Sequence, residues 1–330
     1  MTTLSFMVKM LRNELLNISS ASKFNISNEH EVGMLDSSDN NQFFIGIDGG
    51  GSKCKAIIVD ANNNILGTGI SGPANPLHGY EQAVNSITES ALLALEDAGL
   101  SDIGLENINA GVGLAGVNLP VLFEKMANWQ HPFKQMFLAT DLLIACLGAH
   151  NGEDGAVMIS GTGSCGFSYV KGHPYTLGGH GFPHGDKGSG AWFGFQAANY
   201  VLMSLDSLAE KSLITEKLLA LHNVQEGIEL VEIIAGKPAA FYAKMANIVF
   251  DAAEEGDKVA IEIVNEGAGY ISDVARQLLT QKPPRISLIG GLTPRLKPWL
   301  GQDVQNQLEE PICPPEVGSV LFGQQQLALL

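Results

Sequence analysis

The sequence predicts an α/β protein made of two similar halves, each with strands and helices, and a ligand cleft between them. The 330 residues are about twice the length of one ordinary domain, which favours two domains. Apolar residues make up 45% of the chain and charged residues 16%, a composition that suits a large buried core. A glycine-rich hairpin occurs twice, over 43–59 and over 156–170, which indicates an internally duplicated fold.

Short apolar runs between turn residues predict the strands, and apolar residues at helical spacing predict the helices. In the first half, three consecutive antiparallel strands precede a helix. The predicted strands cover 43–47, 54–59, 65–70, 108–117, 136–140, 156–159, 165–170 and 285–289. The predicted helices cover 79–98, 119–129, 142–150, most of 188–281 and the tail from Val317.

Composition divides the chain into three parts. Residues 1–41 are rich in polar, turn-forming residues and are interpreted as a peripheral extension that could be disordered. Residues 42–151 form the first predicted domain and 152–330 the second. The last helix of the second domain is a candidate to pack back on the first.

Charge and cysteine usage exclude several classes of partner. Lys and Arg number 19 against 35 Asp and Glu, so the net charge of −16 would repel nucleic-acid phosphates and anionic lipid heads. No apolar run reaches the roughly 18 residues of a membrane span. The 4 cysteines are spread singly, without a CxxC pair, as is usual in a reducing compartment. We therefore expect a cytoplasmic protein that binds neither nucleic acid nor membrane.

The two hairpin tips predict a phosphate clamp. The first, from Asp48 to Lys53, has the order Gly-Ser-Lys where a P-loop requires Gly-Lys-Ser/Thr, and a strand rather than a helix follows it. Backbone N–H groups that no Cβ obstructs can instead form a concave nest for phosphate oxygens. A plain glycine-rich turn is the alternative for either tip alone. The repetition favours two tips that grip one polyphosphate from both sides.

The motifs together resemble the actin-like ATPase superfamily that includes sugar kinases. Within it, the pattern is most similar to the bacterial glucosamine kinase and N-acetylglucosamine kinase branch, related to the BadF/BadG-type ATPases. The resemblance covers about 43–330 and rests on GIDGGGSKCKA, SGPANP, TDLLIACLGAH, GAVMISGTGSCG, GGHGFPHGDKGSGAW and a late IGG turn. It implies a two-domain actin-like (ribonuclease H-like) fold with an interdomain cleft, in which both predicted domains are ATPase domains. A homodimer is usual in this branch.

The resemblance implies ATP-dependent phosphoryl transfer to the 6-hydroxyl of an amino sugar. Asp48 would lie by the Mg²⁺ of Mg-ATP, generally through water. A turn carboxylate that caps its own backbone is the alternative for Asp48. The positions implied in ATP binding are Gly49, Gly50, Gly51, Ser52, Lys53, Gly161, Thr162, Gly163, Gly290 and Gly291. For Gly290 and Gly291, an ordinary strand-to-helix turn is an equal alternative.

Asp141 is the expected general base. It follows a strand and precedes a helical run, and the matching aspartate of the family accepts the proton of the sugar hydroxyl. Such a base contributes roughly 10²–10⁴ in rate. The alternative is a helix N-cap for Leu142 onward, and one residue could serve in both ways.

The sugar site is implied by two loops. The residues that match family positions at the sugar are Asn75, Ser164, Gly179, His180, Gly181 and Asp186. Both Asn75 and Asp186 are also ordinary loop residues. His180 stands where the animal enzymes have an aromatic residue, and Lys187 where an acidic or amide residue is usual. The block 145–150 and the surroundings of Ser164 resemble the glucosamine enzymes more than the N-acetylglucosamine enzymes, so we expect a free amino sugar.

Three other interpretations remain open from the sequence. An ATPase activator of a radical dehydratase would need two neighbouring cysteines for an iron–sulfur cluster, and Cys146 and Cys165 are the nearest pair. A nucleotide-gated regulator would not need a base at Asp141. A zinc site built on His173, His180 and His184 lacks an evident fourth ligand.

Overall fold

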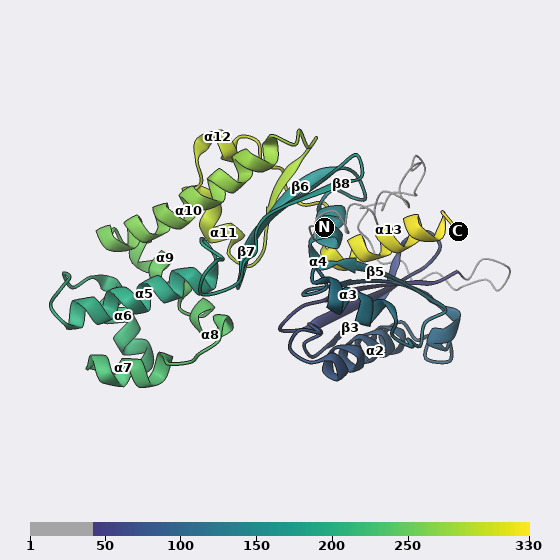
Figure 1. The fold of residues 1–330 in the computed structure, drawn as a ribbon, viewed down its shortest axis with the longest axis horizontal. Helices are drawn as coiled ribbons and strands as arrows, with labels where there is room; N and C mark the ends of the chain where they lie inside the picture. The colour runs from purple at the N-terminus through teal and green to yellow at the C-terminus, as the bar shows by residue number, and fades with distance from the viewer. Residues whose placement is uncertain (1–41) are drawn as a thin grey trace. The chain divides into compact units, whose positions relative to one another are not determined.

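The structure is a computed structural model that describes residues 42–330, so the extension predicted over 1–41 lies outside the described residues. The described chain forms two compact units (Figure 1). Unit 1 comprises the described residues up to Gly155, together with Lys171–Pro174 and Pro311–Leu330. Unit 2 comprises Ala156–Val170 and Tyr175–Glu310. The chain therefore returns to unit 1 for its last 20 residues.

Unit 1 is built on a five-stranded sheet with the order β3-β2-β1-β4-β5. The strands are β1 (Phe44–Gly49), β2 (Cys54–Val59), β3 (Ile65–Ser71), β4 (Asn109–Leu114) and β5 (Gln135–Thr140). β1, β2 and β3 are antiparallel neighbours, whereas β4 pairs in parallel with both β1 and β5. The predicted meander and the two strands that follow it are confirmed.

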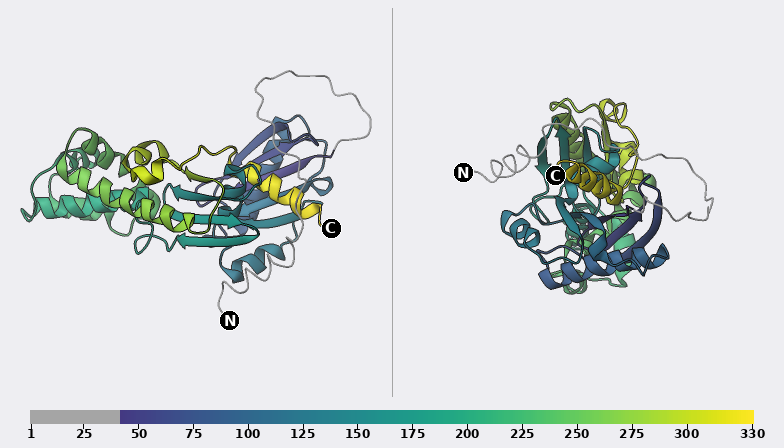
Figure 2. Two further views of the ribbon diagram at one scale, coloured as in Figure 1. Left: turned by 90° about the horizontal axis from the view of Figure 1, so that it is seen from above. Right: turned by 90° about the vertical axis from the view of Figure 1, so that its right-hand side faces the viewer.

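Helices cover both faces of this sheet. α2 (Tyr80–Asp97) packs on β2 and β3, and its apolar side chains join those of Ile45 and Ile47 in one cluster. α4 (Asp141–Ala149) and α13 (Pro315–Leu327) lie side by side on the other face, where Phe44 and Ile57 contact α13 (Figures 1 and 2). Alternate residues of a strand point to opposite faces, which is why β1 contributes to both clusters. The remaining helices of unit 1 are η1 (Leu105–Asn107) and α3 (Pro120–Ala127).

Glycines allow α13 to approach its neighbours closely. A Cβ on Gly46 of β1 would overlap the carbonyl oxygen of Glu316, and one on Gly318 of α13 would overlap the carbonyl oxygen of Ile144 in α4. The contact is also polar, because the Ser319 hydroxyl donates a hydrogen bond to the Ile47 carbonyl at 2.7 Å. The backbone of α13 therefore lies directly on β1 and α4.

Unit 2 contains a four-stranded sheet with the order β8-β7-β6-β9. The strands are β6 (Gly155–Ser160), β7 (Ser164–Val170), β8 (His173–Gly178) and β9 (Ile286–Ile289), and β6 and β9 are parallel. This order repeats β3-β2-β1-β4 of unit 1. β8 was not predicted, because it is a partly exposed edge strand whose Pro174 and alternating polar residues give no apolar run.

The helices of unit 2 pack around a core that includes Phe193 and Phe250. They are α5 (Gly190–Leu205), α6 (Leu213–His222), α7 (Gly227–Ile234), α8 (Ala239–Ala243), α9 (Ala246–Glu254), α10 (Lys258–Leu279), α11 (Thr293–Leu296), η2 (Lys297–Trp299) and α12 (Gln302–Gln305). Along the described chain, we find no helix with the length and apolar character that a membrane crossing requires.

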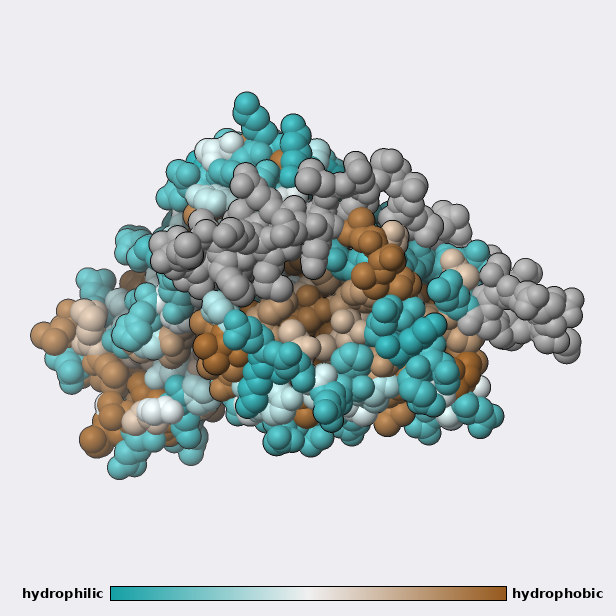
Figure 3. Space-filling model, turned by 45° about the vertical axis from the view of Figure 1, so that its right-hand side comes forward, coloured by the Kyte–Doolittle hydropathy of each residue, from teal (hydrophilic) through white to brown (hydrophobic). Residues whose placement is uncertain are grey.

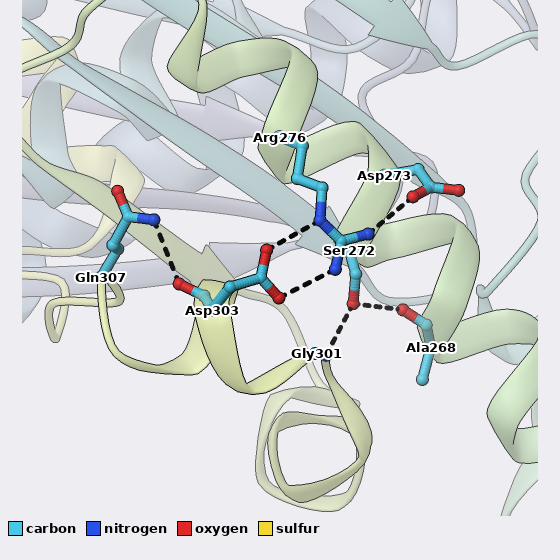
Figure 4. A network of polar contacts seen from close by, with 7 residues as sticks. All are labelled: Ala268, Ser272, Asp273, Arg276, Gly301, Asp303 and Gln307. Atoms are coloured by element: carbon cyan, nitrogen blue, oxygen red, sulfur yellow. Dashed lines mark hydrogen bonds and ion pairs between the residues drawn. The ribbon is translucent and has the colours of Figure 1, made fainter.

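Hydrogen bonds and ion pairs connect α10 to α12 and to Gly301, which precedes α12 (Figure 4). Arg276 of α10 donates from Nε and Nη2 to the two carboxylate oxygens of Asp303 in α12, both at 2.8 Å, and from Nη1 to Asp273 at 2.7 Å. The Gly301 N–H donates to the Ser272 hydroxyl at 2.9 Å. The paired geometry holds α12 in one orientation. It thereby supports the chain that follows the Gly290-Gly291 turn.

Candidate active site

Two carboxylates lie at one edge of the unit 1 sheet. Asp48 is near the carboxyl end of β1, and Asp141 directly follows β5 as the first residue of α4. β1, β4 and β5 run parallel, so their carboxyl ends meet at the same edge. The register pairs Asp48 with Gly113 of β4, where a Cβ would collide with the Ile144 side chain.

The environment of Asp48 disfavours its negative charge. Burial, together with the negative charges of Glu316 and Asp141, raises the pKa of Asp48 to about 7 against the lowering effect of Lys53 and Lys55. Asp48 lies inside strand β1, and no backbone hydrogen bond contributes to the pKa of its carboxyl, which does not support the alternative that it caps its own turn. A buried carboxylate among other acids is stabilised by a cation.

The residues fit a magnesium ion of the kind that accompanies ATP. Carboxylate oxygen is a donor that Mg²⁺ prefers, and Mg²⁺ commonly uses one or two carboxylates together with water and phosphate oxygens. Within 42–330, no group of three or more His, Cys, Asp or Glu side chains comes together as a metal cage. A cation at Asp48 would therefore have to take its other ligands from water and a bound polyphosphate.

Asp141 has the properties of a general base. Burial raises its pKa to about 6, although the backbone N–H groups at the start of α4 lower it in part. One of these is the Leu142 N–H, which donates to Asp141 Oδ1 at 2.9 Å. The N-cap is Thr140, whose hydroxyl accepts from the Leu143 N–H at 3.2 Å, so the N-cap alternative for Asp141 is wrong. A carboxylate with a pKa near 6 can accept a proton at neutral pH.

The loop that carries Asn75 is joined to the first hairpin tip. The Ala74 N–H donates to the Gly50 carbonyl at 2.9 Å, and the Ala115 N–H donates to the Gly49 carbonyl at the same distance. The side chain of Asn75 accepts a hydrogen bond from the Leu77 N–H at 2.9 Å. The tip Gly49 to Lys53, the Asn75 loop and the loop after β4 thus form one connected edge in unit 1.

The second hairpin tip lies at the start of α5 in unit 2. The N–H groups of Gly190 and Ala191 donate to the carbonyls of Gly161 and Thr162, at 2.8 and 3.2 Å. The tip is closed by a bond from the Gly161 N–H to the Gly163 carbonyl at 3.0 Å. The N-terminus of a helix carries a partial positive charge, which favours an anion beside it.

The Gly290-Gly291 turn reaches the same tip. The Leu292 N–H donates to the Ser160 carbonyl at 3.1 Å, and a Cβ on Gly290 would overlap that carbonyl group. Gly290 has a φ of 109°, a conformation that side chains rarely adopt. The structure thus brings Gly161 to Gly163 and Gly290 to Gly291 together in unit 2.

Asp186 is held against the second tip. Its backbone is left-handed, with a φ of 62°, and its carboxylate accepts from the backbone N–H groups of Gly181 and Ser164. Burial raises the pKa of Asp186, and these two bonds lower it in part. The Ser164 hydroxyl donates to the Lys187 carbonyl at 2.7 Å, and the Gly179 N–H donates to the Ser164 carbonyl at 3.2 Å. The loop from Gly179 to Asp186, including His180, is therefore attached to the tip through Ser164.

Sequence reasoning missed three charged residues beside these positions, namely Lys55, Glu316 and Glu266. Glu316 of α13 is buried and pairs with Lys55, which faces Asp48 across the β1–β2 hairpin. Lys187 pairs with Glu266 of α10 at 2.8 Å, so its charge is balanced locally. The register of the hairpin could have indicated Lys55. Nothing in the pattern around Glu316 or Glu266 marks either as a partner, because the contacts join segments far apart in the chain.

The two cysteines weighed for an iron–sulfur cluster lie on different units. Cys146 is buried in α4 of unit 1, where its thiol donates to the Gly155 carbonyl at 3.4 Å. Cys165 lies in β7 of unit 2. Among the described residues, no three or more His, Cys, Asp or Glu side chains come together as a metal-binding group, and the pair considered for a cluster is divided between the two units.

Comparison with known proteins identifies the family. The model of the BadF/BadG/BcrA/BcrD ATPase family matches residues 45–323, which is most of the chain. The protein belongs to this family. A glucosamine kinase of Vibrio cholerae serotype O1 is 33% identical over 284 residues, covering 85% of this chain and 95% of the relative.

Solved structures place the fold. A protein of Chromobacterium violaceum, to which N-acetylglucosamine kinase activity is ascribed, has a TM-score of 0.81 at 28% identity and covers 86% of this chain and 99% of its own. The ROK family glucokinase of Streptomyces griseus, solved with glucose and AMPPNP, has a TM-score of 0.50 at 18% identity, covering 86% and 99%. The predicted actin-like, two-domain sugar kinase fold is confirmed.

Proposed function

We propose that the protein is an ATP-dependent kinase that phosphorylates the 6-hydroxyl of an amino sugar, with glucosamine as the preferred substrate. The observation that carries the proposal is the pair of carboxylates at one sheet edge. Asp141 has a raised pKa suited to a base, and Asp48 has surroundings suited to a cation. The similarity to the Vibrio cholerae glucosamine kinase supports the same reaction.

Each part of the site has a role in phosphoryl transfer. Asp141 accepts the proton of the sugar hydroxyl as that oxygen attacks the terminal phosphate. The N–H groups of Gly51 to Lys53 and of Thr162 and Gly163, which are not used to close the two tips, bind phosphate oxygens, and the Gly290-Gly291 turn lies beneath the adenosine. Asp48 would hold Mg²⁺ beside the phosphates, generally through water. When bound, Mg²⁺ supplies positive charge that offsets the charge on the phosphates.

Sugar hydroxyls are assigned to the two loops attached to the tips. Asn75 and Asp186 offer donors and acceptors for vicinal hydroxyls, and the segment Gly179 to Gly181 covers the ring. The net charge of −16 favours an ammonium sugar over a neutral acetamide. We therefore expect kcat/KM for glucosamine to exceed that for N-acetylglucosamine at least about tenfold.

A phosphorylation screen tests this function. The purified protein is given Mg-ATP with glucosamine, N-acetylglucosamine, N-acetylmannosamine and glucose, and both ADP release and sugar phosphate are measured. We expect glucosamine 6-phosphate as the main product. Equal rates for glucosamine and its acetylated form, or a preference for the latter, would overturn the substrate assignment alone. ADP release without any sugar phosphate would overturn the kinase assignment.

We also propose a cytoplasmic homodimer. The four cysteines form no disulfide in the described chain, which suits a reducing compartment where ATP is available. Hydrophobic side chains are exposed in patches among a hydrophilic surface (Figure 3). Five of them lie between α5 and α7, with Met203 in α5, Leu208 after it, Leu221 in α6, and Ile228 and Val231 in α7. Exposed apolar side chains on these helices support contact with a second copy, and light scattering would measure the mass.

A further inference from the structure

Lys55 and Glu316 form an ion pair beside Asp48. Lys55 is directly opposite Asp48 in the β1–β2 register, so both side chains leave the same face of the sheet. Gly46, two residues before Asp48, lies under the Glu316 carbonyl on that face. The Lys55 ammonium is 2.5 Å from Glu316 Oε1. Glu316 stands in the first turn of α13, and its side chain is 4% exposed.

The pair lies within reach of the Asp48 charge. Asp48 and Lys55 are partners across the β1–β2 hairpin and Glu316 is paired with Lys55, so both charges of the pair lie beside this carboxylate, and Lys53 stands in the adjacent hairpin tip. Lys53 is exposed, whereas Lys55 is tied to the buried Glu316. The pair therefore holds one positive and one negative charge at fixed positions, of which the Glu316 charge is buried and the Lys55 charge is partly exposed to solvent.

We propose that the Lys55–Glu316 pair is a positioning element that sets the affinity of the divalent cation at Asp48. The inference rests on the proposed function, because it takes Asp48 as the carboxylate beside the nucleotide's cation. Lys55 opposes the cation and keeps Asp48 from binding it too tightly for release with product. Glu316 attracts the cation and also prevents Lys55 from pairing directly with Asp48.

Single substitutions should shift cation affinity in opposite directions. Lys55→Gln leaves Asp48 and Glu316 without their shared countercharge, so the cation should bind about 3–10-fold more tightly. Glu316→Gln leaves Lys55 facing Asp48, so the cation should bind about 3–10-fold more weakly. The double variant restores the original sum of charges and should lie close to wild type. A purely structural role would weaken binding in every variant.

The test uses Mn²⁺ in place of Mg²⁺ and measures the concentration of free Mn²⁺ by electron paramagnetic resonance. The protein is in excess over ADP, and the pH is 8. Lys55→Arg should behave as wild type because it keeps the charge. Lys217→Gln and Glu255→Gln serve as matched controls, since they change the net charge equally at an ion pair of unit 2. Thermal unfolding of each variant reports stability separately.

Two results are distinguishable from the expected one. If wild-type protein with ADP retains no more Mn²⁺ than ADP alone, both the nucleotide site and this inference are wrong. If the wild type retains Mn²⁺ but the two single variants shift together or not at all, the inference alone is wrong. If Glu316→Gln fails to fold, the two Lys55 variants still test the inference. Tighter cation binding by Lys55→Gln together with an unchanged affinity in Lys55→Arg would support it. Any other result for these two variants would overturn it.

Discussion

The carboxylate of Asp186 lies against the Cα of Gly163, so close that a Cβ on Gly163 would come within 2.8 Å of Asp186 Oδ2. Gly163 belongs to the tip assigned to phosphate, and Asp186 to the loop assigned to the sugar. The backbone of Asp186 is itself left-handed, which limits its freedom to move aside. In the proposed reaction, the tip that binds phosphate and the loop that binds the sugar would thus be in direct contact.

Gly163→Ala changes the tip proposed to bind phosphate, but we expect it to weaken sugar binding. The added methyl group must displace the Asp186 carboxylate, so we expect KM for glucosamine to rise about tenfold or more. Gly161→Ala is the matched control in the same tip, because the nearest atom to its Cβ would be 4.0 Å away. Steady-state kinetics of both variants give the comparison. Equal effects on sugar KM would mean that the contact with Asp186 does not matter.

Asp141→Asn should keep the fold and nucleotide binding but lower kcat by about 10²–10⁴. The amide has the size of the carboxylate and cannot accept the proton. ADP binding by calorimetry and the melting temperature report the intact fold. Asp102→Asn, an exposed aspartate of the same unit, is the control for the substitution itself. Turnover near that of wild type would remove Asp141 from the mechanism.

The pH dependence of kcat should reflect Asp141. Burial raises its pKa from 3.8 to about 6, so the base is ionised above about pH 6 and protonated below it. We expect kcat, with both substrates saturating, to fall about tenfold per pH unit below pH 6 and to level off above it. N-acetylglucosamine has no titrating amine. The same fall in kcat below pH 6 with this sugar would therefore exclude ionisation of the substrate as its cause. A limb near pH 4 would contradict the effect of burial.

Gly318→Ala should destabilise unit 1. Its Cβ would overlap the Ile144 carbonyl, which is backbone and cannot rotate away, so we expect a loss of about 2 kcal/mol or more in the free energy of unfolding. Gly269→Ala in α10 is the control, because nothing lies within 4 Å of its Cβ. Alanine there should stabilise by roughly 0.5–1 kcal/mol through helix propensity. Chemical denaturation of both variants measures the difference.

Most of the strands and helices could be predicted from the local pattern of the sequence. Hairpins with glycine tips, such as that of Asp48 to Lys53, are visible because the apolar runs and the turn lie next to each other. β8 escaped prediction because an edge strand needs no continuous apolar run. The N-cap alternative for Asp141 could not be decided from the sequence, since Thr140 and Asp141 are both acceptable caps and only the backbone geometry distinguishes them.

The candidate site was only partly predictable for a related reason. Some site residues lie in motifs, and the order of residues within each motif is enough to find them. These are Asp48, Asp141 and the two glycine tips. Glu316 reaches Lys55 across about 260 positions of the chain, and such a pair leaves no local trace. The raised pKa of Asp48 could not be predicted either, because it depends on burial by helices that pack from elsewhere in the chain.

The return of the chain to unit 1 constrains the order of folding during synthesis. The bond from Ser319 to Ile47 spans 272 positions, which at about 5–20 residues per second separates the two partners by roughly 14–54 s of translation. Until then, the face of the sheet that α13 covers is exposed on the nascent chain, while nearly all of unit 2 has already been made. A ribosome-bound chain that ends at Glu310 should therefore bind chaperones that recognise apolar surface, and release from them should follow synthesis of α13.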